Sequence, residues 1–178
     1  QVMMGSWYYC GIDLPQVPGV FINMNGKRYA AESIGYSFSA VEIFNQPFHL
    51  AYWLVDSVGA EATHLFEGHE VSTNNDDSDL LVYQADTLEE LAVKMNVAPD
   101  TLVAEIERYN GFVASGTDED FGKLMTGTTP IEVGPFYALL ETAVPYNTYG
   151  GIETDVDSHV MGVDGEIIPG LYAAGSCC

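Results

Sequence analysis

The sequence is poor in basic residues. Five Lys and Arg stand against 26 Asp and Glu in 178 residues, so the formal net charge is −21. A field of this sign repels phosphate backbones and anionic lipid, which disfavours nucleic acid and membrane surfaces as partners. A generally acidic proteome is an alternative origin of this charge. The few cations available to any anionic substrate are Lys27, Arg28, Lys94, Arg108 and Lys123.

Cysteine and long apolar runs are also scarce. Cys10 and the adjacent pair Cys177 and Cys178 do not form the even, spaced set of a disulfide framework. The sequence contains no C-x-x-C or Cys/His cluster, and its four histidines show no i, i+4 pair, so it predicts no metal site. No stretch reaches the ~18 apolar residues of a membrane-spanning helix.

Hydrophobic residues, by contrast, are plentiful enough for a sizeable core. They make up 47% of the chain, with 12% aromatics, which excludes a disordered segment. Asn25-Gly26 between two β-prone runs predicts a hairpin turn, because both residues tolerate positive φ. The continuous apolar run 50–55 predicts a buried strand, and a helix is expected at about 39–45.

The middle of the sequence has the signals of two helices. Thr87-Leu88-Glu89-Glu90 has the pattern of a capping box, which begins a helix. A second helix is expected to begin at Pro99 or Asp100 and to end near Gly111.

Short strands are expected in the remainder of the chain. An apolar run covers 136–144, the runs 152–155 and 159–163 indicate strands, and Asp164-Gly165 predicts a turn between strands. The whole pattern predicts an α+β fold with helices and short antiparallel strands.

Four groups of residues carry a resemblance to a known family. Their order and spacing resemble the signatures of the fumarate reductase/succinate dehydrogenase flavoprotein superfamily, and they cover nearly the whole chain. The groups are Ile22-Asn23-x-Asn25-Gly26-Lys27-Arg28-Tyr29-x-x-Glu32, Arg108-Tyr109-Asn110 with Asp118-x-Asp120-Phe121-Gly122-Lys123, Pro135-Phe136-Tyr137-Ala138 with Thr148-x-Gly150-Gly151, and Ile168-Pro169-Gly170-Leu171-Tyr172-Ala173-Ala174-Gly175.

The resemblance implies a particular domain organisation. Members of the superfamily bind FAD in a Rossmann-like domain and insert a cap domain that holds the substrate against the flavin. Residues 1–146 would be the cap, or substrate, domain, and residues 147–178 a return segment that forms a C-terminal β stub of the FAD domain. The N-terminal G-x-G-x-x-G of the family is absent. The chain is therefore expected to be a fragment that alone binds FAD weakly or not at all and is inactive.

Two positions distinguish this chain from the members that reduce fumarate. The Arg that serves as their general acid, four residues after the motif Glu, corresponds to Tyr36 here, and their carboxylate-binding His corresponds to Asn147. Arg28 is expected to pair with Glu32, and Arg108 has Glu105 as a candidate surface partner. The resemblance therefore implies that the substrate is not a simple dicarboxylate.

Tyr36 is the main candidate for proton transfer. A Tyr at this position resembles the 3-ketosteroid dehydrogenases, in which tyrosines exchange a proton with a carbon activated by a carbonyl. A phenol with an ordinary pKa of ~10 can do this if its site lowers that pKa. Asn147 and Tyr149 complete the predicted catalytic set, whereas Tyr137 is a weaker candidate. The alternative is that these residues only line the core or the pocket, as most of the 11 tyrosines must.

The cofactor-binding residues follow from the same resemblance. Gly150 and Gly151 lack a Cβ and would let the backbone approach a flavin ring, and the alternative is an ordinary turn. The full predicted set is Thr148, Gly150, Gly151, Ala174, Gly175 and Ser176.

The function implied is that of an FAD-dependent oxidoreductase acting on CH–CH groups, which reduces or forms a C=C bond conjugated to a carbonyl. One alternative is a fumarate- or acrylate-type reductase whose anion-binding Arg lies outside this sequence, and another is a non-catalytic binding domain. The expected partners are a small-molecule substrate, the rest of the flavoprotein chain and an electron-donor protein. The sequence does not assign a compartment.

Overall fold

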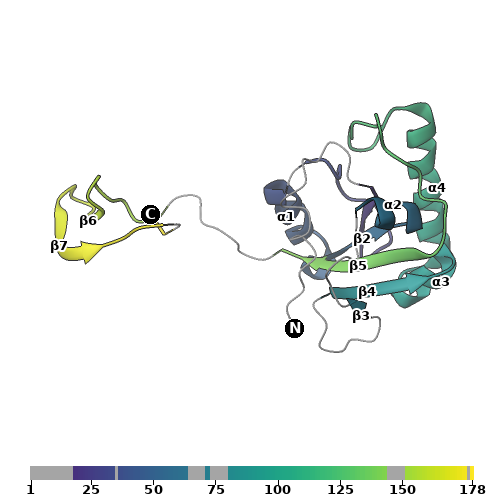
Figure 1. Ribbon diagram of the computed structural model, residues 1–178, viewed down its shortest axis with the longest axis horizontal. Helices are drawn as coiled ribbons and strands as arrows, with labels where there is room; N and C mark the ends of the chain where they lie inside the picture. The colour runs from purple at the N-terminus through teal and green to yellow at the C-terminus, as the bar shows by residue number, and fades with distance from the viewer. Residues whose placement is uncertain (1–17, 35, 64–70, 73–79, 144–150, 176) are drawn as a thin grey trace. The chain divides into compact units, whose positions relative to one another are not determined.

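The computed structural model describes residues 18–34, 36–63, 71–72, 80–143, 151–175 and 177–178. The chain divides into two compact units, Gln1–Ala143 and Val144–Cys178 (Figure 1).

The first unit is built on a five-stranded sheet with the order β1-β2-β5-β4-β3. All neighbouring strands are antiparallel except β3 and β4, which run parallel. Helices and antiparallel strands are thus combined, which confirms the α+β class. The strands are β1 (Val20–Asn23), β2 (Leu50–Val55), β3 (Val71–Ser72), β4 (Leu80–Ala85) and β5 (Phe136–Thr142).

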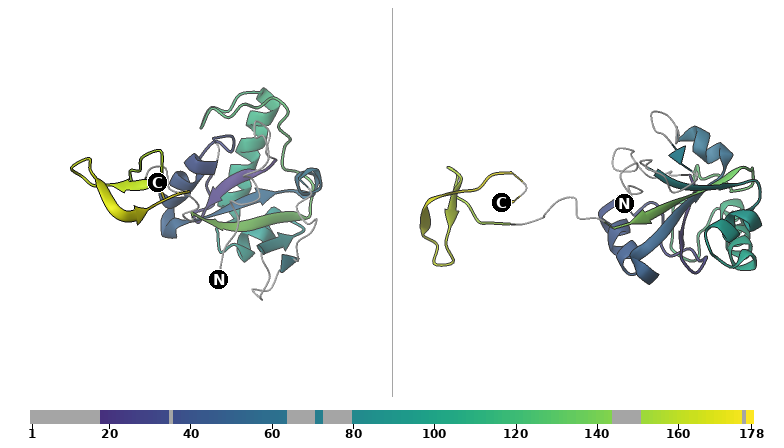
Figure 2. Two further views of the ribbon diagram at one scale, coloured as in Figure 1. Left: turned by 60° about the vertical axis from the view of Figure 1, so that its left-hand side comes forward. Right: turned by 90° about the horizontal axis from the view of Figure 1, so that it is seen from below.

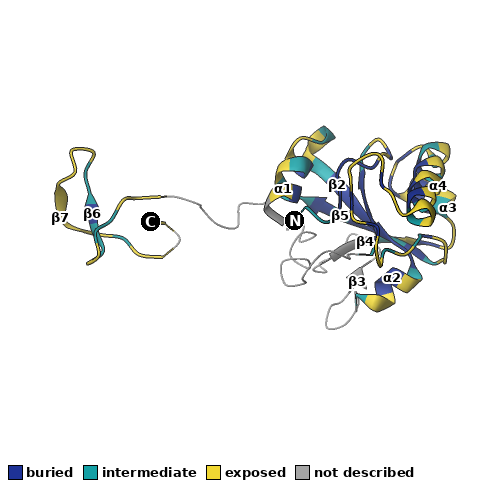
Figure 3. Cartoon of the chain, turned by 90° about the horizontal axis from the view of Figure 1, so that it is seen from above, coloured by how far each residue is buried: buried dark blue, intermediate teal, exposed yellow. Residues whose placement is uncertain are grey.

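The core lies on both faces of this sheet. The expected buried strand is β2, where Tyr52 and Leu54 point into one apolar cluster and Ala51, Trp53 and Val55 into the other, as the alternation of a strand requires. Helices α3 (Leu88–Lys94) and α4 (Pro99–Ser115) supply the first cluster, and α1 (Tyr36–Phe44) and α2 (Ser57–Ala62) the second (Figure 2). Figure 3 shows the buried interiors of β2 and β5.

The helices α3 and α4 begin where the sequence predicts. The Thr87 side chain accepts a hydrogen bond from the Glu90 backbone N–H at 3.2 Å, and Pro99 occupies the first turn of α4. The predicted end of α4 near Gly111 is wrong, because the helix continues to Ser115 and ends at Gly116 in the left-handed conformation (φ 74°). Phe112, the residue after Gly111, is buried, and its packing in the core stabilises the helix beyond the glycine.

The hairpin turn after β1 forms as predicted, but its second arm is not a strand. Gly26 has a φ of 76°, and the Asn23 N–H donates to the Lys27 carbonyl at 2.8 Å. Only a single bridge, between Ile22 and Arg28, continues the pairing. The short 3-10 turn η2 (Pro47–His49) then leads from α1 into β2. No helix in the described part of the chain has the length and apolarity needed to cross a membrane.

The second unit contains a small two-stranded sheet. Strands β6 (His159–Met161) and β7 (Ile167–Tyr172) are antiparallel, and the turn between them contains Gly165 with a φ of 79°. All residues of β7 are exposed (Figure 3). The strand expected at 152–155 is reduced to one bridge, between Thr154 and Val160.

Candidate functional site

The segment between β1 and α1 begins with a tight turn that is attached to α4. The Asn23 side-chain oxygen accepts hydrogen bonds from the backbone N–H groups of Asn25 (3.0 Å) and Lys27 (3.1 Å). Glu105, a buried residue of α4, accepts from Lys27 Nζ at 2.9 Å and from the Arg28 backbone N–H at 3.2 Å. Helix α4 therefore fixes the point at which Arg28 enters the interior.

The Arg28 side chain bridges two carboxylates inside the protein. Its guanidinium donates to Glu32 through Nε (2.8 Å) and NH2 (2.9 Å), which confirms the predicted pair. It also donates to Asp118 through NH1 (2.9 Å) and NH2 (2.7 Å). All three side chains are at most 1% exposed. Two bidentate contacts satisfy four of the five guanidinium donors in a geometry that lysine could not reproduce.

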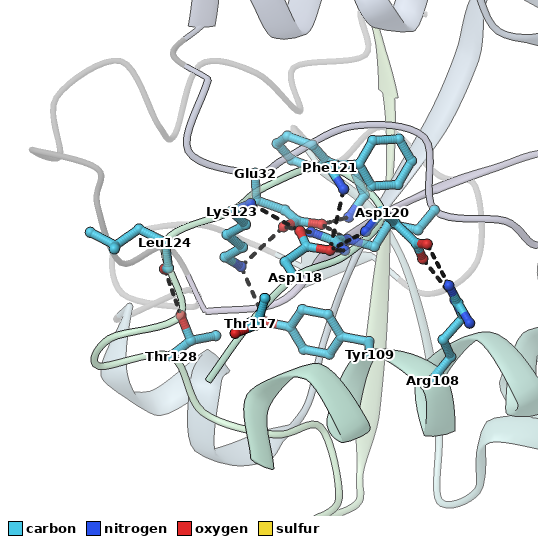
Figure 4. A network of polar contacts seen from close by, with 12 residues as sticks. Glu32, Arg108, Tyr109, Thr117, Asp118, Asp120, Phe121, Lys123, Leu124 and Thr128 are labelled. Carbon is cyan, nitrogen blue, oxygen red and sulfur yellow. Dashed lines mark hydrogen bonds and ion pairs between the residues drawn. The ribbon is translucent and has the colours of Figure 1, made fainter. Parts of the chain in front are cut away.

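Lys123 completes the charge balance of this cluster. Its Nζ lies 3.0 Å from Glu32 Oε2 and 3.1 Å from the hydroxyl of Tyr109 on α4, and the side chain is fully buried. Two cations and two anions are thus buried together. We call these four groups the Arg28 cluster: Arg28, Glu32, Asp118 and Lys123. Figure 4 shows Glu32, Asp118 and Lys123 converging beside Tyr109. Buried charges are tolerated when they are paired in this way.

The pKa shifts within the cluster follow from burial and pairing. Burial alone would raise the pKa of Asp118, but hydrogen bonds from the Arg28 guanidinium and the Lys123 N–H lower that pKa to about 2. Burial lowers the pKa of Lys123, and the neighbouring Glu32 carboxylate opposes the shift. Burial also disfavours ionised Arg28, but its hydrogen bonds to Glu32 and Asp118 raise its pKa. Arg28 and Asp118 therefore remain ionised at neutral pH.

The Arg28 cluster positions the chain that enters α1. Glu32 Oε1 also accepts the Phe21 backbone N–H of β1 at 3.2 Å, so this carboxylate is joined to the sheet as well. Helix α1 begins four residues later, at Tyr36. The structure describes the Tyr36 backbone but not its side chain, and the role of Tyr36 in proton transfer stays a prediction.

The five Lys and Arg side chains, all within the described residues, each contact an internal acceptor. Arg108 pairs with Asp120, to which its Nε donates at 2.8 Å, rather than with Glu105 as expected, because Glu105 already binds Lys27. Lys94 Nζ donates to the Gln84 carbonyl. With Arg28 and Lys123 in their cluster, all five cations of the chain have protein partners.

The described part of the first unit contains two buried side-chain atoms that lack a hydrogen-bond partner. Within the described residues, the Tyr29 hydroxyl and Glu141 Oε1 are the buried side-chain oxygens that form no hydrogen bond. Glu141 follows the alternation of β5 and lies beside Ala51 on the α1 face of the sheet. Burial raises the pKa of Glu141 to about 8. Burial, followed by the Glu141 charge, raises the pKa of Tyr29. Our sequence reasoning missed Glu141, although its inward position in 136–142 was the signal for it.

The predicted flavin-binding and catalytic residues of the second unit are only partly described. Five of them lie outside the described residues, namely Asn147, Thr148, Tyr149, Gly150 and Ser176. The others are Gly151, Ala174 and Gly175, and their flavin contacts stay predictions.

Ala174 and Gly175 lie in open surroundings, whereas Gly151 has an internal reason for lacking a side chain. Ala174 is exposed, and Gly175 has a φ of 86° with open space at its Cβ position. At Gly151, a Cβ would lie only 2.3 Å from the Cys177 carbonyl oxygen. The conformation of the chain itself thus requires a glycine at position 151.

Three side chains of the second unit lie close enough together to hold a cation. One ligand atom from each of Asp155, Asp157 and His159 falls within 4.8 Å of the others. Asp155 also accepts the backbone N–H groups of Asp157 (3.0 Å) and His159 (2.8 Å), so its contacts are those of a hydrogen-bonded turn. Our sequence reasoning did not single out this D-x-D-x-H spacing.

Comparison with known proteins identifies a family model and curated relatives. A model described as "FAD binding domain" matches residues 2–178. NADH:acrylate oxidoreductase of Vibrio harveyi is 34% identical over 172 residues, which cover 93% of this chain and 16% of that protein. The 3-oxosteroid 1-dehydrogenase of Mycolicibacterium smegmatis is 31% identical over 186 residues, which cover 89% of this chain and 33% of that protein. The chain thus spans a third or less of these two relatives.

A solved structure shows the same fold. The open conformation of a flavocytochrome c3 fumarate reductase matches with a TM-score of 0.73 and 24% identity. The match covers 99% of this chain and 29% of that one.

Removing one charge of the Arg28 cluster should destabilise the protein strongly. In Asp118→Asn the Arg28 and Lys123 cations are left facing one anion, and breaking a buried ion pair costs about 3–5 kcal/mol. Asp120→Asn breaks the more exposed pair with Arg108 and should cost no more than about 1 kcal/mol. Urea unfolding followed by circular dichroism measures both. Similar losses in the two variants would contradict the structural role of the cluster.

Glu141→Gln should change how stability depends on pH. Folding raises the pKa of Glu141 from 4.5 to about 8. The folded chain therefore retains a proton that the unfolded chain releases, and stability falls as pH rises through this window. At about 1.4 kcal/mol per pKa unit, the variant should gain on the order of 4 kcal/mol at pH 8 and little at pH 5. Unfolding curves at the two pH values measure this difference.

Tyr29→Phe is the matched control for this experiment. It removes the neighbouring hydroxyl but leaves the Glu141 carboxyl buried, so the fall in stability between pH 5 and pH 8 should persist. A Glu141→Gln variant with the same pH dependence as the unmodified chain would show that Glu141 is not held protonated.

Proposed function

Because this chain belongs to the family of FAD binding domains, we propose that it serves an FAD-dependent oxidoreductase that reduces or forms a C=C bond conjugated to a carbonyl. Two curated relatives support this reaction class, since their names give acrylate and 3-oxosteroids as substrates. In each compound, the carbonyl carbon is bonded to one carbon of a C=C bond or of the saturated C–C bond from which a C=C bond can form. FAD, when bound, supplies the acceptor or donor of the hydride.

The two parts of the chain have different tasks in this proposal. Residues 1–146 cover the substrate, and residues 147–178 form the return segment of the FAD-binding domain. The division is supported by the separate compact units Gln1–Ala143 and Val144–Cys178. The open space at Gly175 supports a flavin contact in the second part.

The Tyr36 hydroxyl exchanges the proton that balances the hydride. The observation that carries this proposal is the Arg28 cluster, which fixes Glu32 and thereby the chain four residues before Tyr36, where α1 begins. A proton donor must be held within hydrogen-bond reach of its carbon, and a buried charged cluster is a rigid support for the segment that carries it.

The surroundings of Tyr36 favour a neutral, apolar substrate. On the exposed side of α1 lie Phe38 and Phe44, which are 70% and 60% exposed, and Val41 lies between them. All five cations of the chain have internal partners, so this stretch offers no clamp for a dicarboxylate. A cyclic ketone with a conjugated C=C bond, or its saturated form, is the substrate class that fits these features.

A reductase for an unsaturated acid is the second candidate function. The 34% identity to an acrylate oxidoreductase favours it. In that case the carboxylate of the substrate would be bound by an Arg outside these 178 residues, because both arginines of the chain are paired internally.

Tyr36→Phe tests the proton-transfer role in the flavoprotein that carries this sequence. General acid–base catalysis contributes about 10²- to 10⁴-fold, so turnover of a conjugated cyclic ketone should fall by at least about 10²-fold. Binding of FAD, measured by its visible absorbance, should be unchanged.

The control is Tyr83→Phe, which removes a hydroxyl from the partly buried side of β4. This variant should keep its turnover within about twofold, because Tyr83 lies on β4 and not on the segment that leads into α1. Retention of full activity by Tyr36→Phe would remove Tyr36 from the mechanism.

A further inference from the structure

Glu141 is enclosed between the sheet and α1. In the register of β5 and β2 it lies opposite Ala51, which belongs to the same apolar cluster as Ile43 of α1. Helix α1 contacts both of these strands (Figure 3). The Glu141 side chain is fully buried, and its Oε1 forms no hydrogen bond with a described residue. A carboxyl group therefore lies in an apolar layer that α1 covers.

No described cation on the surrounding segments is available to Glu141. Arg28 binds Glu32 and Asp118, and His49 Nδ1 lies 2.5 Å from the Phe44 carbonyl at the end of α1. The other ionisable side chains described on residues 28–34, α1, α2 with its N-cap and the α1 face of β5 are acidic or phenolic. They are Tyr29, Glu32, Glu42, Asp56, Glu61 and Tyr137. While α1 covers Glu141, its ionised form would thus be an unpaired buried charge, which is costly.

The charges of three carboxylates act together beside this layer. Burial raises the pKa of Tyr29, and the charges of Glu141, Glu32 and Glu42 raise it further. Glu42 belongs to α1 itself, so an ionised Glu141 would repel the helix that covers it.

Helix α1 is the least firmly held of the elements around Glu141. It has nine residues, fewer than the ~12–15 that an isolated helix needs, and no basic residue in its last turn offsets the helix dipole. Of its described side chains, Ser39 and Ile43 are the buried ones. Strands β2 and β5, by contrast, are each paired on both sides. Displacing α1 therefore hydrates Glu141 at a lower cost than parting the sheet.

We propose that α1 is a pH-sensitive cover, which opens from the sheet when Glu141 loses its proton. The closed form holds the protonated acid, and the open form exposes the carboxylate to water. Because the closed form binds the proton more tightly, raising the pH favours opening. The pKa of Glu141 rises from 4.5 when hydrated to about 8 when covered. The opening constant should therefore increase by about tenfold per pH unit between these values, and by about 50-fold from pH 6 to pH 8.

Opening of α1 has a consequence for the proposed reaction. Tyr36 is the first residue of α1, so opening would displace the proposed proton donor, and turnover would fall at alkaline pH. This consequence rests on the proposed function. The opening of the helix does not, because it follows from the burial of Glu141.

Amide hydrogen exchange measures the opening directly. After correction for the intrinsic pH dependence of exchange, the protection of the amides in α1 should fall by about 50-fold from pH 6 to pH 8. At both pH values these amides should be at least about tenfold less protected than those of α4, which open only when the unit unfolds. Protection in α1 that does not change with pH, or that equals the protection of α4, would overturn the proposal.

Two variants separate the proton from the helix. Glu141→Gln removes the titrating group, so protection in α1 should agree within about twofold at pH 6 and pH 8. Gln46→Ala loosens α1 by another route, because the Gln46 side chain donates to the Glu42 carbonyl and accepts from Asn23 Nδ2, both at 3.0 Å. This variant should lower protection in α1 at both pH values and keep the 50-fold ratio.

Either of two results from the variants would refute the role of Glu141. One is a Glu141→Gln variant that keeps the 50-fold fall in protection, and the other is a Gln46→Ala variant that loses it. No readout involves flavin or turnover, so failure of the proposed function leaves these results unaffected.

Discussion

The buried guanidinium of Arg28 is the interaction on which the first unit depends. It joins the turn after β1, the Glu32 carboxylate and the loop that carries Asp118, and Lys123 balances the remaining charge. Each of these groups would be costly to bury alone, so the segments that carry them can adopt this arrangement only together. The chain that leads into α1 is thereby fixed, although it has little regular secondary structure. The start of α1, at Tyr36, follows four residues after a carboxylate that is buried in this cluster.

The same pairing sets the electrostatic character of the candidate site. The protein has only five cations, and each is engaged by an internal acceptor, two of them within the Arg28 cluster. The surface is left with an excess of carboxylates, which repels anions and raises no barrier to neutral substrates. The exposed phenylalanines of α1 add apolar area beside Tyr36. Charge scarcity and helix composition therefore favour the same class of ligand.

Local patterns predicted the parts of the fold that depend on neighbouring residues. The Arg28–Glu32 pair, the strand at 50–55 and the start of α4 each follow from short spacings, and the structure confirms them. Features set by distant residues were missed. Arg108 pairs with Asp120 because Lys27 occupies Glu105, and α4 passes Gly111 because Phe112 is buried. Gly151 was assigned to a flavin contact from its motif, and its packing against the Cys177–Cys178 peptide could not be inferred from spacing.

The central claim is that this chain covers a site for neutral carbonyl compounds, because its Lys and Arg side chains are paired within the protein. The choice of substrate tests this claim most directly. The measurement compares, in the flavoprotein that carries this sequence, the kcat/KM for fumarate with that for a cyclic ketone conjugated to a C=C bond, using one electron donor. We predict that the ketone is preferred by at least about 10²-fold, since a site without a cation leaves both carboxylates of fumarate unpaired. Reduction of fumarate as fast as that of the ketone would contradict the claim.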